Sequence, residues 1–529
     1  MPLVLATLLS ATLSGITGRL VRVEVDVAPG LPGFTIVGLP DAALSEARER
    51  VRGALRNAGY HHPPRRITVN LAPAEVRKAG ASLDLAIALG ILLGSEQLRA
   101  APGRVALIGE LGLGGEVRAV PGVLPMGLAL VAAGVRRVLV PASAVEEAAL
   151  VPGLDVVGVA TVTEAAEAVR APRARRRAPL PLPRADGLAG SGVPSNAAPD
   201  PRLLPASPSA VDLEDVRGQA VARRALEIAL AGGHAMLLIG PPGAGKTLLA
   251  RTIPGLLPDL DDEAALAATV IASVAGGEPV RSLVRRPPVR APHHTVSYAG
   301  MVGGGPRLSP GEVTLADQGV LVCDELPEFG RDVLEALRQP LEDGSVSVVR
   351  VGRAAVFPER FTLVAAMNPC PCGMDGMADR SCTCPPGVPP RYRRRISGPL
   401  RDRIDLWVAV GRVPPALLVA GPVPESSAVV ATRIAAARER QRMRPGALSN
   451  GRMRGRLLRT ACRLGAAEAA RAIVLAEREG LSGRGTERLL RVARTIADLD
   501  ASDRVLAAHL DEAARFRAPA ETPSLAEAG

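Results

Sequence analysis

The chain has 529 residues and carries 64 Lys and Arg against 53 Asp and Glu, a formal net charge of +11. Six cysteines in so long a chain exclude a disulfide framework, and no apolar run approaches the ~20 residues of a membrane-spanning helix. The positive charge favours an anionic partner such as nucleic acid, although arginine enrichment of a solvated surface would give the same balance. With one Trp and three Tyr, contact with DNA would use phosphates rather than base stacking.

Apolar and alternating segments predict an α/β protein of several domains. Residues 1–170 alternate strand-like and helical stretches, whereas 171–210 are rich in Pro and Arg without periodicity, as expected of an extended linker. Strands and helices alternate again in 211–412, and 425–516 are helical, followed by a short tail, 517–529. The apolar start of the chain has no early basic residue and runs into an alternating strand. It therefore predicts a folded domain of a cytoplasmic protein rather than a signal peptide.

Lysine is nearly absent from this chain, which makes its two lysines informative. Only Lys78 and Lys246 occur among the 64 basic residues, and Lys246 lies between a predicted strand and a predicted helix. Its segment matches the phosphate-binding pattern G-x-x-x-x-G-K-[ST] and consists of Gly240, Pro241, Pro242, Gly243, Ala244, Gly245, Lys246 and Thr247. In such a loop, backbone N–H groups hold the phosphates of ATP, the lysine bridges the β- and γ-phosphates, and the threonine hydroxyl binds Mg²⁺.

Two further predicted strands end in polar side chains that suit this chemistry. The apolar run 320–323 precedes Asp324 and Glu325. Behind a phosphate loop, Asp324 is expected to hold Mg²⁺ through water, and Glu325 to polarise the attacking water. The run 361–366 leads to Asn368, whose amide would orient that water and sense the γ-phosphate. An Asn before Pro is also a common turn former, so the pattern leaves both interpretations open.

A cysteine cluster follows directly, in a segment, 368–395, that we expect to be an insertion. It contains Cys370, Cys372, Cys382 and Cys384. Four thiolates so close together, spaced by Pro, Gly, Ser and Thr, can close a tetrahedral site for structural zinc. The single-residue gaps within each pair are shorter than those of most zinc sites.

Two arginines in the C-terminal half are candidates for neutralising charge on a transferred phosphate. Arg403 follows a predicted turn, where it would reach the γ-phosphate of a neighbouring subunit. Arg484 begins a predicted helix of the lid, from which it would close over the nucleotide. In an arginine-rich chain, spacing alone does not distinguish either residue from a solvated arginine.

Together these motifs resemble the YifB/ComM subfamily of the magnesium-chelatase class of AAA+ ATPases, over nearly the whole chain. The most specific marks lie outside the phosphate loop: Gly30–Asp41, Arg290–Ser297, Gly300–Gly305, Pro310–Glu312, Asp324–Phe329 and Asn368–Gly373. The resemblance implies an AAA+ core, a helical lid and an N-terminal domain with a Lon-protease-like fold. It also implies a ring, as a hexamer, that acts on DNA as a helicase driving branch migration during natural transformation.

The resemblance also implies roles for single residues. Asn368 would be the sensor-1 residue, Arg403 the arginine finger and Arg484 the sensor-2 arginine, with ATP bound between subunits. The chain departs from the family at Arg401, where a leucine-like residue is usual. Two arginines therefore compete for the finger role, and we favour Arg403 because it keeps its place in Asp-Arg-Ile-Asp.

Two insertions are relevant to how such a ring would contact its substrate. The segment 290–305 lies where this class places a loop directed at the central pore, and its adjacent histidines would normally point apart rather than share a metal. The segment 345–357 predicts a β-hairpin, whose Arg350 and Arg353 either contact DNA phosphates or form a solvated tip.

Parts of the sequence suggest three other functions. Ser82 falls near the nucleophile position of a Lon-like fold, but Lys78, the only lysine in residues 1–210, is badly placed to serve as its base, so we expect no peptidase. The chain could instead be the ATPase subunit of a magnesium chelatase, although such subunits lack the N-terminal domain and the cysteine cluster. A protein-remodelling AAA+ regulator without a nucleic-acid partner is the remaining alternative.

Overall fold

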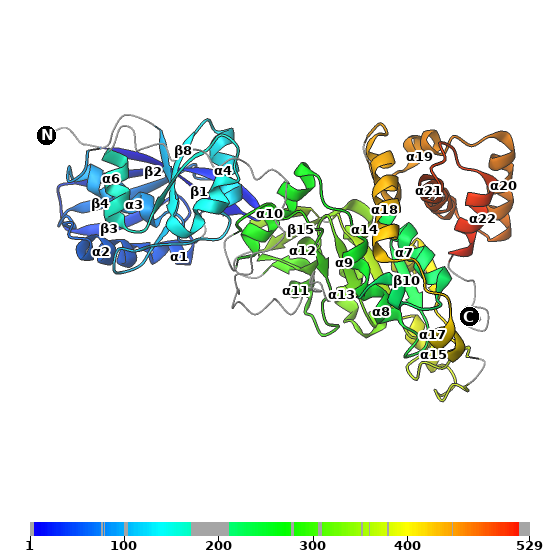
Figure 1. Cartoon of the computed structure of the whole chain (residues 1–529). Helices are drawn as coiled ribbons and strands as arrows, with labels where there is room; N and C mark the ends of the chain where they lie inside the picture. The colour runs from blue at the N-terminus through cyan, green and yellow to red at the C-terminus, as the bar shows by residue number, and fades with distance from the viewer. Residues whose placement is uncertain are drawn as a thin grey trace.

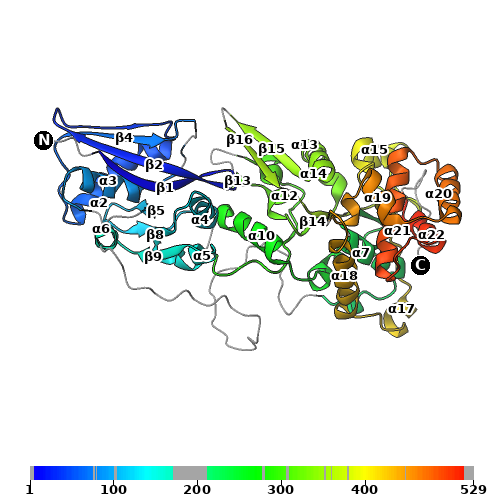
Figure 2. The same ribbon diagram turned by 90° about the horizontal axis from the view of Figure 1, so that it is seen from above.

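The computed structural model describes most of the chain. The described residues are 5–75, 78, 80–99, 104–170, 211–276, 280–304, 309–350, 353–358, 360–377, 380–446 and 448–517. The predicted linker, 171–210, and nearly all of the predicted tail lie outside them. Three parts follow one another along an elongated molecule, with an N-terminal α/β part at one end, a central parallel sheet, and a helical C-terminal part at the other end (Figure 1 and Figure 2).

The N-terminal part is built on a seven-stranded mixed sheet in the order β3-β4-β2-β1-β5-β8-β9. Its strands are β1 (Ala6–Ser14), β2 (Thr17–Ala28), β3 (Gly33–Val37), β4 (Arg66–Ala72), β5 (Val105–Leu107), β8 (Arg137–Pro141) and β9 (Asp155–Val159). The apolar start of the chain forms β1, which pairs with β2 along its whole length through a tight turn at Gly15. A small hairpin joins β6 (Glu110–Leu111) to β7 (Val117–Arg118).

Helices cover both faces of this sheet, and each face has its own aliphatic core. One face carries α1 (Ala42–Ser45), α2 (Ala47–Asn57), α3 (Asp84–Gly94) and α6 (Val162–Arg170), and the other carries α4 (Val123–Ala132) and α5 (Val145–Ala149). Helix α3 is almost entirely buried because its sequence, DLAIALGILLG, is apolar all round.

The central part contains a five-stranded sheet in the order β11-β14-β17-β10-β18. Its strands are β10 (Met236–Ile239), β11 (Val289–Arg290), β14 (Val320–Cys323), β17 (Thr362–Met367) and β18 (Leu406–Ala409), and every neighbouring pair is parallel. The strands are short and apolar, as expected for strands covered on both faces. Parallel pairing places the carboxyl ends of all five strands at one edge and their starts at the other.

Helices and two small hairpins surround the central sheet. The helices are α7 (Ala220–Gly232), α8 (Lys246–Arg251), α9 (Ile253–Leu256), α10 (Asp262–Ala275), α11 (Tyr298–Val302), α12 (Glu312–Leu315), α13 (Arg331–Ala336), α14 (Arg338–Asp343), α15 (Val388–Arg393), α16 (Gly398–Arg401) and α17 (Pro415–Ala420). The hairpins pair β12 (Gly303–Gly304) with β13 (Ser309–Pro310), and β15 (Ser345–Arg350) with β16 (Arg353–Pro358). The second hairpin is the one that the sequence predicts, but its arginine side chains lie outside the described ones.

The C-terminal part is helical, with α18 (Ser427–Arg442), α19 (Gly455–Cys462), α20 (Ala466–Arg478), α21 (Gly483–Leu499) and α22 (Ala507–Arg515). Its apolar side chains join those of α7 and one face of the central sheet in a single core. The expected combination of α/β layers, a parallel sheet and a helical C-terminal part is thereby confirmed. Among the described residues, no helix is both long and apolar enough to span a membrane.

The N-terminal and central parts are joined by a buried polar contact. The carboxylate of Glu147 accepts hydrogen bonds from the backbone N–H of Leu124 (2.9 Å) and the hydroxyl of Ser273 (2.6 Å). The backbone carbonyl of Ser273 accepts a further bond from Gly122 N–H (2.9 Å). Glu147 lies on α5, and helices α4 and α10, which carry Leu124 and Ser273, lie against each other in Figure 2.

Candidate functional site

The phosphate loop, the acid pair and the asparagine meet at one edge of the central sheet. Gly240 follows β10, Asp324 follows β14, and Asn368 follows β17, which lies between the other two strands. Because the three strands are parallel, their carboxyl ends reach the same edge, which is where α/β sheets bind ligands. The structure thus brings together the residues that the sequence assigns to ATP.

Lys246 is the centre of this group. Its ammonium donates hydrogen bonds to the carbonyl oxygens of Gly240 (2.7 Å) and Pro241 (2.9 Å) and to Oδ1 of Asn368 (3.1 Å). Burial lowers its pKa to about 8, although the carboxylates of Asp324 and Glu325 oppose that shift. A phosphate beside this ammonium would favour its charged form further.

The glycines of the loop keep its outer side open. Gly243 and Gly245 have φ angles of +79° and +90°, which favour glycine, and a Cβ added to either would meet no atom within 4 Å. Gly240 is different, because a Cβ there would lie 2.1 Å from the carbonyl oxygen of Val410. The loop is therefore packed against the end of β18 on one side and open on the other, as a cradle for phosphates requires.

The oxygens of Thr247 and Asp324 form the pair expected to hold Mg²⁺. The Thr247 hydroxyl donates a hydrogen bond of 2.7 Å to Oδ2 of Asp324. A hydroxyl and a carboxylate beside a phosphate loop match the hard oxygen ligands that Mg²⁺ prefers. The residues present therefore fit both Mg²⁺ and ATP.

Glu325 projects from a strained backbone position. Its φ of +53° lies in the left-handed region, and its side chain is 54% exposed. Nδ1 of His294 lies 3.8 Å from its Oε2, and the rings of His293 and His294 lie 4.1 Å apart. Sequence reasoning missed His294 as a neighbour of the acid pair. The only signal was the position of the segment 290–305 before β14, and spacing cannot show which histidine turns towards Glu325.

Arg403 and Arg484 lie at the opposite edge of the same sheet. Arg403 comes just before β18, where the backbone N–H groups of Asp405 and Leu406 bond to the carbonyl of Ala235 at the start of β10. Arg484 begins α21, and its guanidinium lies 3.7 Å from Glu342, which also pairs with Arg403.

The sequence leads us to expect Arg484 to close over the nucleotide from the lid. In the structure it does not approach the phosphate loop of its own chain. The reason is that Arg488 and Arg491, one and two turns further along α21, contact Ile404 and Asp405 at the starts of the strands.

Arg401, the rival for the finger role, is already engaged within the chain. Its guanidinium lies 5.1 Å from the ring centroid of Trp407, a cation–π contact. Arg403 donates instead to the carbonyl of Pro399 (2.7 Å) and pairs with Glu342.

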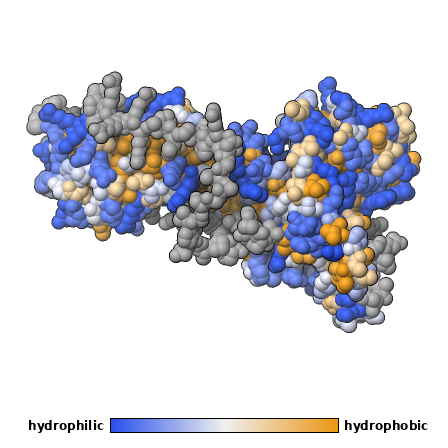
Figure 3. All heavy atoms as spheres, viewed as in Figure 1, coloured by the Kyte–Doolittle hydropathy of each residue, from blue (hydrophilic) through white to orange (hydrophobic). Residues whose placement is uncertain are grey.

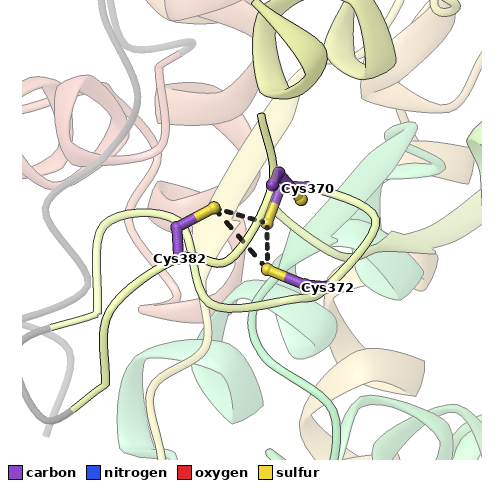
Figure 4. A group of neighbouring side chains, drawn as sticks. Cys370, Cys372 and Cys382 are labelled. Atoms are coloured by element: carbon purple, nitrogen blue, oxygen red, sulfur yellow. Dashed lines mark hydrogen bonds between the residues drawn. The ribbon is translucent and has the colours of Figure 1, made fainter. Parts of the chain in front are cut away.

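The four cysteines converge as a metal site requires. Their sulfur atoms all lie within 4.8 Å of one another, and this is the only such group of possible metal ligands among the described residues. Figure 4 shows Cys370, Cys372 and Cys382 pointing towards a common centre, with sulfur–sulfur distances of 3.3, 3.6 and 3.7 Å. Cys370 is buried.

This cluster touches the phosphate loop. A Cβ added to Gly373 would lie 2.3 Å from Cδ of Pro242, so the two loops are in close contact. Arg393 of α15 holds the cysteine loop in place by donating to Asp375 (2.5 Å) and to the carbonyl of Pro369 (3.3 Å). The contact between Gly373 and Pro242 joins residues about 130 positions apart, so no sequence pattern could have predicted it.

The N-terminal residues considered for a peptidase are not arranged as one. The Ser82 hydroxyl donates to the carbonyl of Ala11 (3.0 Å), and the buried Lys78 ammonium donates to the carbonyl of Pro73. Burial lowers the pKa of Lys78. Each group is thus occupied by a backbone carbonyl, which gives Lys78 a structural role.

Comparisons with known proteins agree with this geometry. The family profile described as magnesium chelatase, subunit ChlI, matches residues 212–418, and profiles described as subunit ChlI of Mg-chelatase and subunit ChlI C-terminal match 23–144 and 424–517. The protein YifB of Escherichia coli is 42% identical over 95% of each chain, and the competence protein ComM of Haemophilus influenzae is 40% identical over 97% of each. The chain belongs to the YifB/ComM subfamily of magnesium-chelatase-like AAA+ ATPases.

A more distant likeness covers part of this YifB/ComM-family chain. The DNA replication licensing factor Mcm2 of Drosophila melanogaster is 25% identical over 225 residues, which is 40% of this chain and 22% of the licensing factor. Membership of the AAA+ family suggests ATP and Mg²⁺ as ligands and an ATPase activity.

The pKa of Lys246 gives a test of the phosphate loop. Raising the pH through about 8 neutralises this lysine in the free protein, and only the ammonium attracts phosphate. We therefore expect the dissociation constant of MgATP to be flat near pH 7 and to rise by up to about tenfold per pH unit above 8. Isothermal titration calorimetry or fluorescence anisotropy would measure it.

The matched control is Lys246→Arg, whose guanidinium stays charged throughout this range. The variant is expected to bind weakly at every pH, because the broader group does not fit, and to show no inflection near pH 8. A dissociation constant of the unaltered chain that stays constant up to about pH 9.5 would contradict the assignment of Lys246.

Proposed function

We propose that this protein is a ring-forming motor that hydrolyses MgATP and acts on DNA, as a helicase of the branch-migration type. One observation carries the proposal: the nucleotide-binding residues and the candidate arginines lie at opposite edges of one parallel sheet. Arg403 cannot serve the phosphate loop of its own chain across the sheet. A second chain, placed edge to edge with the first, would bring both halves of the site together, and repetition of that contact closes a ring such as a hexamer.

In this proposal each residue has a defined task. Lys246 binds the β- and γ-phosphates, Thr247 and Asp324 hold Mg²⁺, and Glu325 draws a proton from the attacking water. Asn368 orients that water. Its amide is already held beside the phosphate loop, because its oxygen accepts a hydrogen bond from Lys246. Bound Mg²⁺ would supply neutralisation of the phosphate charge.

Arg403 and Arg484 of the adjacent subunit complete the site in this proposal. An arginine contributed by a neighbour stabilises the charge that develops on the transferred phosphoryl group. The placement of Arg484 beside Arg403 supports a role for it at the same neighbouring nucleotide.

An exposed apolar helix beside the nucleotide edge supports contact between chains. Helix α17, which follows β18, has no buried residue, and Leu418, Val419 and the nearby Val423 are 51%, 85% and 65% exposed. Figure 3 shows hydrophobic side chains gathered over this part of the molecule. Contiguous apolar surface of this kind is typical of a protein–protein contact.

Two facts support DNA as the substrate rather than a tetrapyrrole or a protein. The formal charge of +11 suits a polyanion. Two proteins with similar sequences, ComM and Mcm2, are named for competence and for DNA replication licensing. The cytoplasmic location follows from the same proposal, because chromosomal and incoming DNA are processed there.

We further propose that the four cysteines hold a structural Zn²⁺ and that the N-terminal part has a Lon-protease-like fold without peptidase activity. Thiolates within 4.8 Å of one another suit tetrahedral zinc. Because Gly373 touches Pro242, the zinc would support the phosphate loop. The engagement of Ser82 and Lys78 by backbone carbonyls supports a domain that binds rather than cleaves.

Hydrolysis measured with and without DNA tests the motor. Branched or single-stranded DNA is expected to bind and to raise the ATPase rate. The Glu325→Gln variant is expected to bind ATP normally while its turnover falls by about 10²- to 10⁴-fold, because the general base is lost. If DNA neither binds nor stimulates hydrolysis, the function on DNA is lost, and retained turnover in Glu325→Gln would remove Glu325 from the mechanism.

Metal analysis of the purified chain tests the zinc proposal. We expect about one Zn²⁺ per chain, and a large loss of it in Cys370→Ser. That variant should also bind ATP more weakly, because the loop that contacts Pro242 is no longer tied. Cys462→Ala, a buried cysteine outside the cluster, is the matched control and should keep the metal. A wild-type chain purified without zinc from zinc-containing medium would contradict the proposal.

A further inference from the structure

A cleft rich in arginine lies between the starts of the central strands and the helical C-terminal part. Its arginines are Arg403, Arg452, Arg454, Arg484, Arg488 and Arg491. Two of these arginines have a carboxylate close by in the wall of the cleft: Arg491 pairs with Asp405 (3.2 Å), and Arg488 lies 3.7 Å from Asp402. Glu342 differs from these two aspartates, which lie just before β18, because it reaches the arginines from helix α14.

Glu342 is held from several sides. Its Oε2 pairs with Arg403, its Oε1 lies 3.7 Å from Arg484, and its backbone carbonyl accepts a 2.9 Å hydrogen bond from Arg454. Arg403 and Glu342 are the more protected pair, with side chains 17% and 31% exposed, whereas Arg484 is 79% exposed. The bond to Arg403 therefore carries most of the interaction, and Arg484 adds a weaker, solvent-screened contact.

Arg403 is not fully satisfied by this carboxylate. Its Nε is buried and has no hydrogen-bond partner among the described residues. Burial lowers the pKa of Arg403, and the nearby guanidinium groups of Arg338, Arg484 and Arg454 lower it further. A cluster of guanidinium groups with unused donors suits an anion with more oxygens than one carboxylate, and phosphate is such an anion.

We propose that Glu342 is an internal competitor: its carboxylate binds Arg403 and Arg484 in the isolated chain and is displaced when the phosphate of a neighbouring subunit's nucleotide reaches them. This inference rests on the proposed function, in which Arg403 serves the adjacent subunit. Both anions compete for the same guanidinium groups. Glu342 thus weakens assembly of the ring until the neighbour is loaded with ATP.

The position of Glu342 in the chain connects this exchange to the β15–β16 hairpin. Helix α14 ends at Asp343, Gly344 turns with a φ of +68°, and β15 begins at Ser345. Release of the Glu342 side chain would free the base of this hairpin, while the backbone bond from Arg454 keeps the end of α14 attached. Engagement of a nucleotide at one subunit interface thereby reaches the hairpin that directly follows α14.

The Glu342→Gln variant tests the proposal in two ways that do not need hydrolysis. The first measures assembly by analytical ultracentrifugation at increasing concentrations of a slowly hydrolysed ATP analogue. Without the competing charge, the analogue concentration for half-maximal assembly should fall about 5-fold or more. The second measures thermal unfolding of the nucleotide-free chain with inorganic phosphate, which should raise the unfolding midpoint about 2 °C more in the variant than in the wild type.

Glu439→Gln is the matched control, because Glu439 also pairs with an arginine, Arg442 (3.2 Å), but lies on α18 and does not line the cleft. It should behave as the wild type in both assays. Addition of Arg403→Ala to Glu342→Gln should remove the response to phosphate.

The proposal is overturned if Glu342→Gln responds to phosphate and assembles as the wild type does. It is also overturned if the variant assembles less readily, which would make Glu342 a support that holds the arginines in their working pose. If the wild type does not assemble at all with the analogue, the proposed ring is wrong. The phosphate measurement then still decides the role of Glu342.

Discussion

The parallel pairing of five short strands is the constraint on which the candidate site depends. It gathers the residues that follow β10, β14 and β17 at one edge, where Lys246, Asp324 and Asn368 meet. It sends the residues that precede β18, including Arg403, to the other edge. The nucleotide residues and Arg403 of a single chain therefore lie at opposite ends of the strands. The proposed function unites them between two copies of the chain, with Arg403 of one copy at the phosphate loop of the next.

The two edges also carry two different kinds of cation. The phosphate loop uses the compact ammonium of Lys246, which fits beneath three acceptor oxygens contributed by its own loop and by Asn368. The opposite edge carries guanidinium groups, whose planar forks would, in the proposed exchange, leave Glu342 for a phosphate without losing hydrogen bonds. The cysteine loop and the buried contact of Glu147 with Ser273 attach further parts of the molecule to this frame.

Much of the nucleotide half could be predicted from sequence, because strand, loop and helix are consecutive and the chemistry of each position is narrow. Asp324 and Asn368 were predicted for the same reason, since each follows an apolar strand. The surroundings could not be predicted. The contact of Gly373 with Pro242, the approach of His294 to Glu325 and the pairing of Glu342 with Arg403 join distant segments. The orientation of Arg484 depends on how α21 packs, which its own sequence does not specify.

The central claim is that the two half-sites are completed between chains, and mixing two inactive variants tests it most directly. Lys246→Ala lacks the phosphate grip, and Arg403→Ala lacks the neighbour's arginine, so each alone should show almost no ATPase activity. In an equal mixture that forms mixed rings, about a quarter of the interfaces pair an intact phosphate loop with an intact arginine, and ATPase activity should return to about that fraction of the wild type. Mixed rings that remain inactive would contradict the account.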